Sequence, residues 1–232
     1  MSDQSPFNKE EMPFNDLPAA VVALALLIGG IEMLFQIGSY GIIGGPEAVG
    51  WRITAIENYG FFDPVFDAMF SRNSWPLEHV IRFLSYSMIH VSMVQALMAV
   101  VFVLALGKMV AELFGNVAFI AIFALAALAG SVAYGLFLDS SVPLLGAYPG
   151  AYGLIGAYTF ILWLGLGAVK ENKMRAFTLI GFLLGIQLIW GIIFGGNPTW
   201  VADVSGFVVG FAMSPLLVPG AFPRILEKLR KR

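Results

Sequence analysis

Long apolar runs, separated by short polar or glycine-rich segments, dominate the pattern of this sequence. Each run extends over about 20 residues with few charged positions, which is the length that an α-helix needs to cross a bilayer. We place six spans at Ala19–Ile37, Ile81–Leu106, Val117–Leu138, Gly150–Val169, Phe177–Gly195 and Val201–Val218. The pattern therefore predicts an all-α polytopic membrane protein, a bundle of six transmembrane helices over residues 19–218.

The segments outside the runs differ in character. Residues 1–18 are polar and mostly acidic, unlike the basic start of a secretory signal peptide. Residues 38–80 form a long loop rich in Gly, Pro and aromatic residues, and we expect its "FFDPVF" stretch to lie at the membrane interface. Residues 219–232 form a basic tail, "RILEKLRKR" at its end. We interpret this tail as an ordinary positive flank, with contact to anionic lipid as the alternative.

Basic residues predict the orientation of the bundle. An even number of spans puts both termini on one side, and that side collects ten of the 13 Lys and Arg residues. The other three all lie in the long loop or directly after it, and they are Arg52, Arg72 and Arg82. Since cytoplasmic loops carry the excess of positive charge, we expect both termini to be cytoplasmic and residues 38–80 to be extracytoplasmic.

Composition narrows the function classes. The chain is 59% hydrophobic and 12% charged, about half the charged fraction of a soluble domain. Cysteine is absent, which excludes disulfides and thiolate chemistry. Two histidines without a cluster of carboxylates make a metal site improbable, and we expect no cofactor. Ion transport needs several facing carboxylates, and the one that we identify inside a span is Asp203, so transport is disfavoured.

Polar side chains at membrane depth need a physical reason, because a charged group there costs roughly 2.5–3.5 kcal/mol. We place His90 and Gln95 on the second span and expect His90 to bond a backbone group of a neighbouring loop. Gln187 on the fifth span is expected to join two helices. Lys108 and Glu112 are expected to form a solvated pair at a cytoplasmic turn.

Small residues indicate where helices pack closely. They recur at short intervals at the start of the fourth span and along the sixth, at Gly146, Gly150, Gly153, Gly156, Gly206 and Gly210. Such spacing lets two helix backbones approach in a membrane. Generic helix packing is the simplest explanation of these glycines taken alone.

Taken in order, these pieces resemble the rhomboid family of intramembrane serine proteases. That family has a six-helix bundle and a long first extracytoplasmic loop. Its second helix reads His-x4-His-x3-Asn, its fourth begins Gly-x-Ser-Gly, and its sixth carries Ala-His-x-x-Gly-x-x-x-Gly. The corresponding segments here are "RFLSYSMIHVSMVQALMAVV", "LLGAYPGAYGLIGAY" and "VADVSGFVVGFAM", and the resemblance covers roughly residues 78–216. The framework positions are Arg82, His90, Gly107, Gly146, Pro149, Gly153, Gly156, Ala202, Gly206 and Gly210, and all of them except Pro149 match the family's residue.

At the positions that the resemblance assigns to catalysis, the chain departs from the family. Tyr148 stands at the position of the nucleophilic serine and Asp203 at that of the catalytic histidine. Pro149 replaces the glycine after the serine. Gln95 and Ala99 stand where the family has its oxyanion donors, the second His and the Asn. The resemblance thus implies a degenerate dyad and a degenerate oxyanion hole.

These substitutions predict the loss of the family's chemistry. A phenol with a nearby carboxylate does not reproduce a serine hydroxyl whose proton an imidazole takes and returns. An alanine supplies no donor to an oxyanion, a loss of about 2.7–4 kcal/mol in other enzymes. We therefore expect a pseudoprotease. We also hypothesise a hydrogen bond between Tyr148 and Asp203, the alternatives being that Asp203 is protonated or solvated.

Inactive relatives such as the derlins bind transmembrane segments of other proteins, and the resemblance implies a similar role here. Our leading hypothesis is a non-catalytic binder of client helices in quality control, trafficking or assembly, in a bacterial inner membrane. One alternative is a structural subunit of a larger membrane complex. The other is a hydrolase of residual or altered activity that uses Ser140, Ser141 or Ser205.

Overall fold

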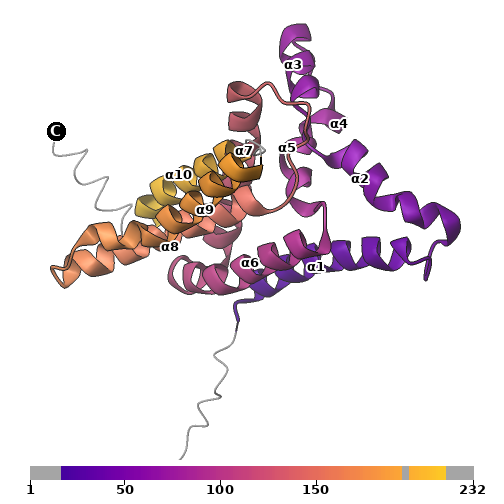
Figure 1. Cartoon of the computed structure of the whole chain (residues 1–232). Helices are drawn as coiled ribbons and strands as arrows, with labels where there is room; N and C mark the ends of the chain where they lie inside the picture. Colours follow the sequence, from indigo (N-terminus) through magenta and orange to yellow (C-terminus); the bar gives the residue numbers. More distant parts are fainter. Residues whose placement is uncertain (1–16, 195–198, 218–232) are drawn as a thin grey trace, which may run out of the picture.

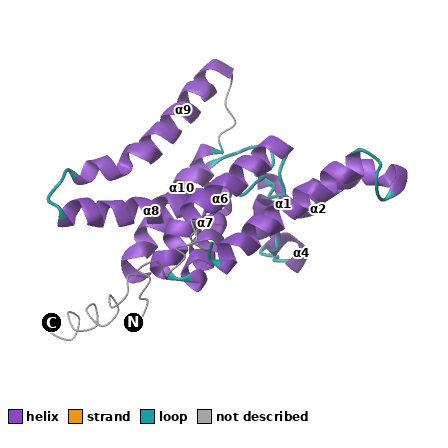
Figure 2. Cartoon of the chain, turned by 90° about the horizontal axis from the view of Figure 1, so that it is seen from below, coloured by secondary structure: helices purple, strands orange, loops and turns teal. Residues whose placement is uncertain are grey.

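Helices make up nearly all of the regular structure in the computed structural model, which describes residues 17–194 and 199–217 (Figures 1 and 2). The elements are α1 (Ala19–Ser39), η1 (Gly45–Gly50), α2 (Trp51–Tyr59), α3 (Asp63–Arg72), α4 (Leu77–Val80), α5 (Arg82–Ser85), η2 (Tyr86–Met88), α6 (Met93–Phe114), α7 (Asn116–Phe137), α8 (Tyr148–Ala168), η3 (Lys173–Phe177), α9 (Thr178–Phe194) and α10 (Trp200–Leu217). Most of the polar N-terminal segment and the basic tail that the sequence suggests fall outside the described residues.

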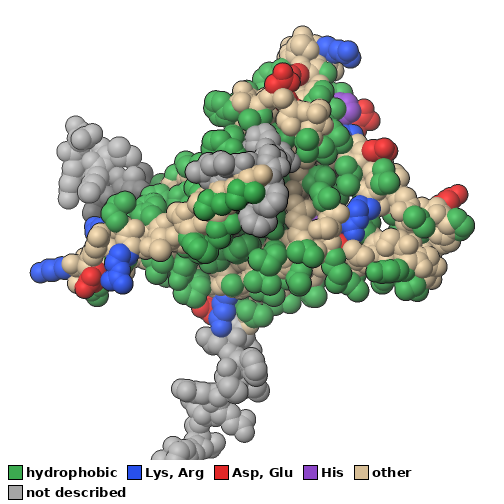
Figure 3. All heavy atoms as spheres, viewed as in Figure 1, with side chains coloured by type: hydrophobic (Ala, Val, Ile, Leu, Met, Phe, Trp, Pro, Cys, Tyr) green, Lys and Arg blue, Asp and Glu red, His purple; other side chains and the backbone are tan. Residues whose placement is uncertain are grey.

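Five of these helices, α1, α6, α7, α8 and α10, are long and apolar enough to cross a membrane. The fifth predicted span coincides with α9, which has 17 residues and is the shortest of the six long helices. Hydrophobic side chains cover the flanks of the helices in Figure 3, and the charged groups gather at their ends and in the long loop. The chain is therefore an integral membrane protein. A sixth span and the orientation of the termini stay predictions.

The predicted second span, Ile81–Leu106, is wrong at both ends. The chain forms the short elements α4, α5 and η2 there, and α6 begins only at Met93. Ser92 ends the preceding loop, since its side chain accepts a hydrogen bond from the Gln95 amide at 3.3 Å. A serine followed three residues later by glutamine is a helix-start signal that hydropathy alone overlooks. Consequently His90 lies before the helix, and Gln95 lies in its first turn.

Helices α7, α8 and α10 form the centre of the bundle, and α8 and α10 approach with glycine between their backbones. A Cβ atom added at Gly210 would collide with the Gly153 carbonyl, and one at Gly206 with the Pro149 carbonyl. At Gly156 it would collide with the Phe207 carbonyl. The predicted close packing of the fourth and sixth spans is confirmed at Gly153, Gly156, Gly206 and Gly210, whereas Gly150 packs against Phe123 of α7 and Gly146 lies before α8. This packing fixes the N-terminal ends of α8 and α10 next to each other.

The long loop is not irregular. It contains η1 and α2 to α4, and Arg82 holds the turn between α2 and α3. The Arg82 guanidinium donates to the carbonyls of Glu57 at 2.8 Å and Gly60 at 3.1 Å, and it lies over the Phe62 ring. Burial lowers the pKa of Arg82 from its ordinary value, although the group stays a cation. This framework residue of the resemblance therefore organises the loop.

The α8–α10 contact makes a direct prediction. Gly210→Ala places a methyl group against the Gly153 carbonyl and should lower stability by roughly 1–3 kcal/mol, the usual cost of overpacking. Thermal unfolding in mild detergent measures this. Gly30→Ala on α1 is the matched control, because nothing lies within 4 Å of a Cβ at that position. Equal melting temperatures for the two variants would contradict the close contact.

Candidate functional site

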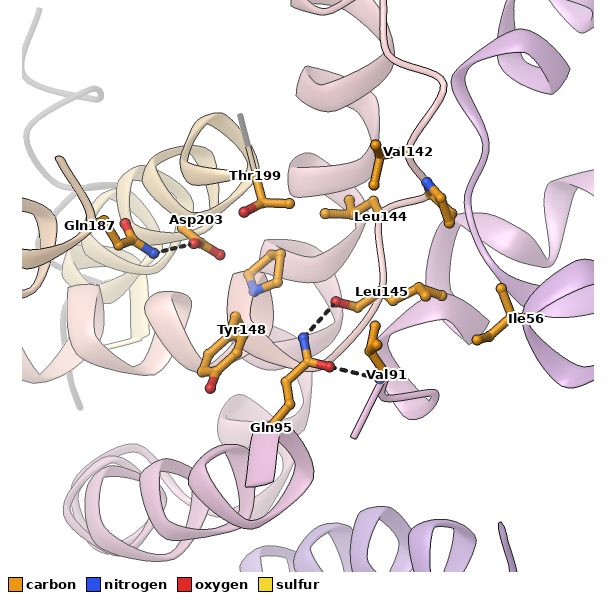
Figure 4. Close-up of a pocket in the computed structure, with 12 residues that line it drawn as sticks. Ile56, Val91, Gln95, Val142, Leu144, Leu145, Tyr148, Gln187, Thr199 and Asp203 are labelled. Atoms are coloured by element: carbon orange, nitrogen blue, oxygen red, sulfur yellow. Dashed lines mark hydrogen bonds between the residues drawn. The ribbon is translucent and has the colours of Figure 1, made fainter. Parts of the chain in front are cut away.

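A cavity of about 450 Å³ lies at the end of the bundle that carries the long loop (Figure 4). It is bounded by the first turns of α6, α8 and α10, by α9 and by the segment before α8. Apolar side chains provide most of its wall, with a few polar groups among them. The lining residues are Ile56, Val91, Gln95, Val142, Pro143, Leu144, Leu145, Tyr148, Pro149, Gln187, Thr199 and Asp203.

The turn into α8 explains the sequence Gly-Ala-Tyr-Pro. Gly146 has φ +97°, a conformation that favours glycine, and a Cβ there would lie 2.9 Å from Gln95 Nε2. Pro149 occupies the first turn of α8, where its missing N–H costs no helical hydrogen bond. The phenol of Tyr148 thereby stands at the mouth of the helix and lines the cavity.

Asp203 has a partner, but it is not the one that we hypothesised. Gln187 Nε2 of α9 donates to Asp203 Oδ2 at 2.8 Å, while the carboxyl group is 3% exposed. The Tyr148 ring packs edge-on against Phe102, with 6.5 Å between centroids, and its hydroxyl points away from Asp203 in Figure 4. The hypothesis of a Tyr148–Asp203 hydrogen bond is therefore wrong in this structure. The prediction that Gln187 joins two helices is confirmed.

Both the oxygen and the nitrogen of the Gln95 side-chain amide bond to the protein backbone. Its Oε1 accepts from the Val91 amide at 2.8 Å, and its Nε2 donates to the Leu145 carbonyl at 3.3 Å. It thus ties α6 to the segment before α8 (Figure 4). Ala99 is fully buried one turn further along α6 and offers only a methyl group. At the two positions that the resemblance assigns to oxyanion donors, Ala99 supplies no donor, and Gln95 keeps one N–H beyond the one bonded to Leu145.

His90 anchors the turn before α8 from outside the cavity. It is 1% exposed, and its Nε2 accepts a hydrogen bond from the Ala147 amide at 3.2 Å. Burial lowers the pKa of His90 to about 4, so that the ring is neutral at pH 7 and can accept. The expected bond between His90 and a loop backbone group is confirmed.

The sequence reasoning missed an ion pair in the membrane domain. Glu32 on α1 is 4% exposed and receives both terminal nitrogens of Arg52, at 2.9 and 2.7 Å, together with the Gln36 amide at 2.9 Å. Arg52 also donates to the His90 carbonyl at 2.6 Å. A glutamate within an apolar run was a signal that it required a partner. The pair links α1, the long loop and the turn that His90 holds.

Neither the cavity nor the rest of the described residues contains a group of three His, Asp or Glu side chains arranged to hold a metal ion. The site can therefore offer hydrogen bonds from single side chains and an apolar wall. Around it, Arg82 and His90 bond the backbone of loops, and the glycines of α8 and α10 allow these helices to pack closely.

Comparison with known proteins identifies the architecture. The chain matches the rhomboid domain over residues 77–220. It belongs to the rhomboid family. No curated protein matches the chain. The rhomboid domain includes α6 to α10 and nearly all residues of the cavity, whereas α1 and the Glu32–Arg52 pair involve residues that precede it.

A hydroxyl deletion distinguishes Tyr148 from a structural tyrosine. Tyr148→Phe should leave thermal stability unchanged, because the described residues give this phenol no hydrogen-bond partner. Tyr86→Phe is the control, since the fully buried Tyr86 hydroxyl donates to the Ala127 carbonyl at 2.7 Å. That variant should lose about 1 kcal/mol, the usual net value of such a bond. A melting temperature lowered equally by both substitutions would restore the hypothesis that Tyr148 has a polar partner.

Proposed function

We propose that this rhomboid-family protein is a pseudoprotease that binds transmembrane segments of client proteins without cleaving them. One observation carries the proposal. The position that the resemblance assigns to the catalytic base holds Asp203, and this carboxyl group is bonded to Gln187 rather than to a hydroxyl nucleophile. Both ends of Gln95 are engaged, and Ala99 has no donor.

Among the described residues, no serine is paired with a base as acyl transfer requires. Among the described residues, those that line the cavity include neither serine nor histidine. The Ser140 hydroxyl interacts with Tyr134 and the Val142 amide, and the Ser205 hydroxyl donates to the Val201 carbonyl of its own helix. A serine nucleophile needs a base within hydrogen-bond reach. These contacts disfavour the alternative of residual hydrolysis.

Helix α9 supports the binding half of the proposal. After the turn at η3 it diverges from α8, as Figure 2 shows, and its outer face carries a stripe of exposed apolar side chains at helical spacing. The stripe consists of Phe182, Ile186, Ile189 and Ile193. Lipid covers such a face by default, but a client helix is an equally apolar partner in the membrane. Gln187 lies on the inner side of the same helix and connects it to the cavity through Asp203.

Hydrolysis is tested with a single-span substrate and two forms of the protein. We expect no cleavage by the native chain, because it lacks a hydroxyl nucleophile paired with a base. The comparison protein carries Tyr148→Ser, Pro149→Gly, Asp203→His, Gln95→His and Ala99→Asn together. Cleavage by this variant alone would show that the scaffold still positions a dyad. Cleavage by the native protein, removed by Asp203→Asn, would overturn the pseudoprotease proposal.

Client binding is tested against the structural-subunit alternative. The tagged native protein is purified in mild detergent and its partners are quantified by mass spectrometry. A client binder should retain many single-span proteins below stoichiometry, and a bulky substitution on the α9 stripe such as Ile186→Trp should reduce them severalfold. The matched control is Leu136→Trp, an exposed position on α7. One or a few partners at constant ratio would instead indicate a permanent subunit.

A further inference from the structure

The Asp203 end of the cavity has a hydrogen-bond acceptor without a donor. Asp203 Oδ2 is bonded to Gln187, but no described residue donates to Oδ1. Gln187 Oε1 is buried and has no partner among the described residues. One N–H of the Gln95 amide is bonded to the Leu145 carbonyl, and the Tyr148 hydroxyl points away from Asp203 (Figure 4). A buried acceptor without a donor costs free energy, so the cavity has an unmet requirement for a hydrogen-bond donor.

Charge points in the same direction. The lining residues include one carboxyl group, Asp203, and no Lys, Arg or His. Arg52, whose guanidinium reaches the turn before α6, is bonded to Glu32 and to the His90 carbonyl. An anionic ligand would therefore meet an uncompensated carboxyl group, whereas a cation would find a partner. The cavity selects for a positively charged donor.

The geometry of the acceptors favours an ammonium over a guanidinium. Arginine binds a carboxylate best through both oxygens at once, but Gln187 already occupies Oδ2 of Asp203. An ammonium has three donors that rotate freely on a flexible stem, and one of them is enough for the single free oxygen of Asp203, Oδ1. The stem of a lysine is apolar and suits a wall formed by residues such as Ile56, Val91 and Leu144.

We propose that the cavity binds the ammonium group of a lysine on a client's transmembrane segment, near the end of that segment on the long-loop side. Asp203 receives it, and the bond from Gln187 to Oδ2 holds the carboxyl group in place. The inference rests on the proposed function, because it names the feature by which a client helix is recognised. The position along the segment follows from the cavity, which lies in the first turns of α6, α8 and α10.

The test measures the affinity of labelled single-span peptides for the purified full chain in phosphatidylcholine nanodiscs. One peptide carries a lysine near the end expected to meet the long loop, a second has norleucine in its place, and a third has the lysine at the opposite end. We expect the first to bind about tenfold or more tightly than the other two, since removing one partner of a buried charge pair weakens complexes strongly. Asp203→Asn should abolish this preference.

Glu112→Gln is the matched control, because it also removes one carboxylate, at an exposed position near the end of α6 that forms a 3.8 Å pair with Lys108. It should leave the preference intact. If Asp203→Asn is not monodisperse, the three peptides on the native protein still decide the question. The third peptide shows whether the lysine must lie at the cavity end.

The outcomes separate the inference from the function on which it rests. Equal binding of all three peptides would overturn lysine recognition and leave client binding standing. Failure of every peptide to bind would overturn the proposed function itself. Loss of the lysine preference in nanodiscs that contain phosphatidylethanolamine would assign the acceptors to a lipid amine and overturn the inference. A preference that persists there and disappears with Asp203→Asn supports it.

Discussion

The structure depends on the contact between the backbones of α8 and α10. Neither helix could approach the other so closely with a Cβ at Gly206 or Gly210, because carbonyl oxygens of Pro149 and Gly153 occupy that space. In a membrane, lipid tails are as apolar as side chains, so association relies on close van der Waals contact rather than on expulsion of water. The contact brings the first turns of both helices together. For this reason Tyr148 and Asp203 line the same cavity.

Hydropathy predicted the long helices well because a membrane leaves the backbone little choice. Every amide and carbonyl in the hydrocarbon must be paired, and an uninterrupted helix pairs them within one apolar run. The predicted starts and ends of α1, α7 and α10 accordingly agree closely with the structure. The start of α6 does not, because the residues before it are apolar without being helical in one piece. There the boundary is decided by Ser92 and Gln95, whose side chains bond the backbone, and a hydropathy average contains no information about such bonds.

The candidate site was predictable in its parts and not in its pairings. Local features of sequence indicated that small residues pack α8 against α10, that His90 bonds a loop and that Gln187 joins helices. The partners were not local. Gln187 meets Asp203 and not Tyr148 because the path of α9 relative to α10 determines it. The Glu32–Arg52 pair was missed because it connects α1 with the long loop. A hydropathy profile evaluates these two segments independently and cannot show a contact between them. Both pairings depend on how separate elements are arranged in space, and residue spacing along one helix does not contain that information.

The energetics of Asp203 explain why the cavity is more than a relic of packing. Insertion scales assign an aspartate inside a membrane helix a cost of roughly 2.5–3.5 kcal/mol at the centre, less toward the ends. One hydrogen bond between membrane helices is worth about 0.6–2 kcal/mol. The bond from Gln187 therefore offsets only part of the cost of a side chain that is 3% exposed. The Glu32 carboxylate shows the alternative within the same protein, since two guanidinium nitrogens and an amide satisfy it. Asp203 has one donor where Glu32 has three, and no described residue donates to its second oxygen.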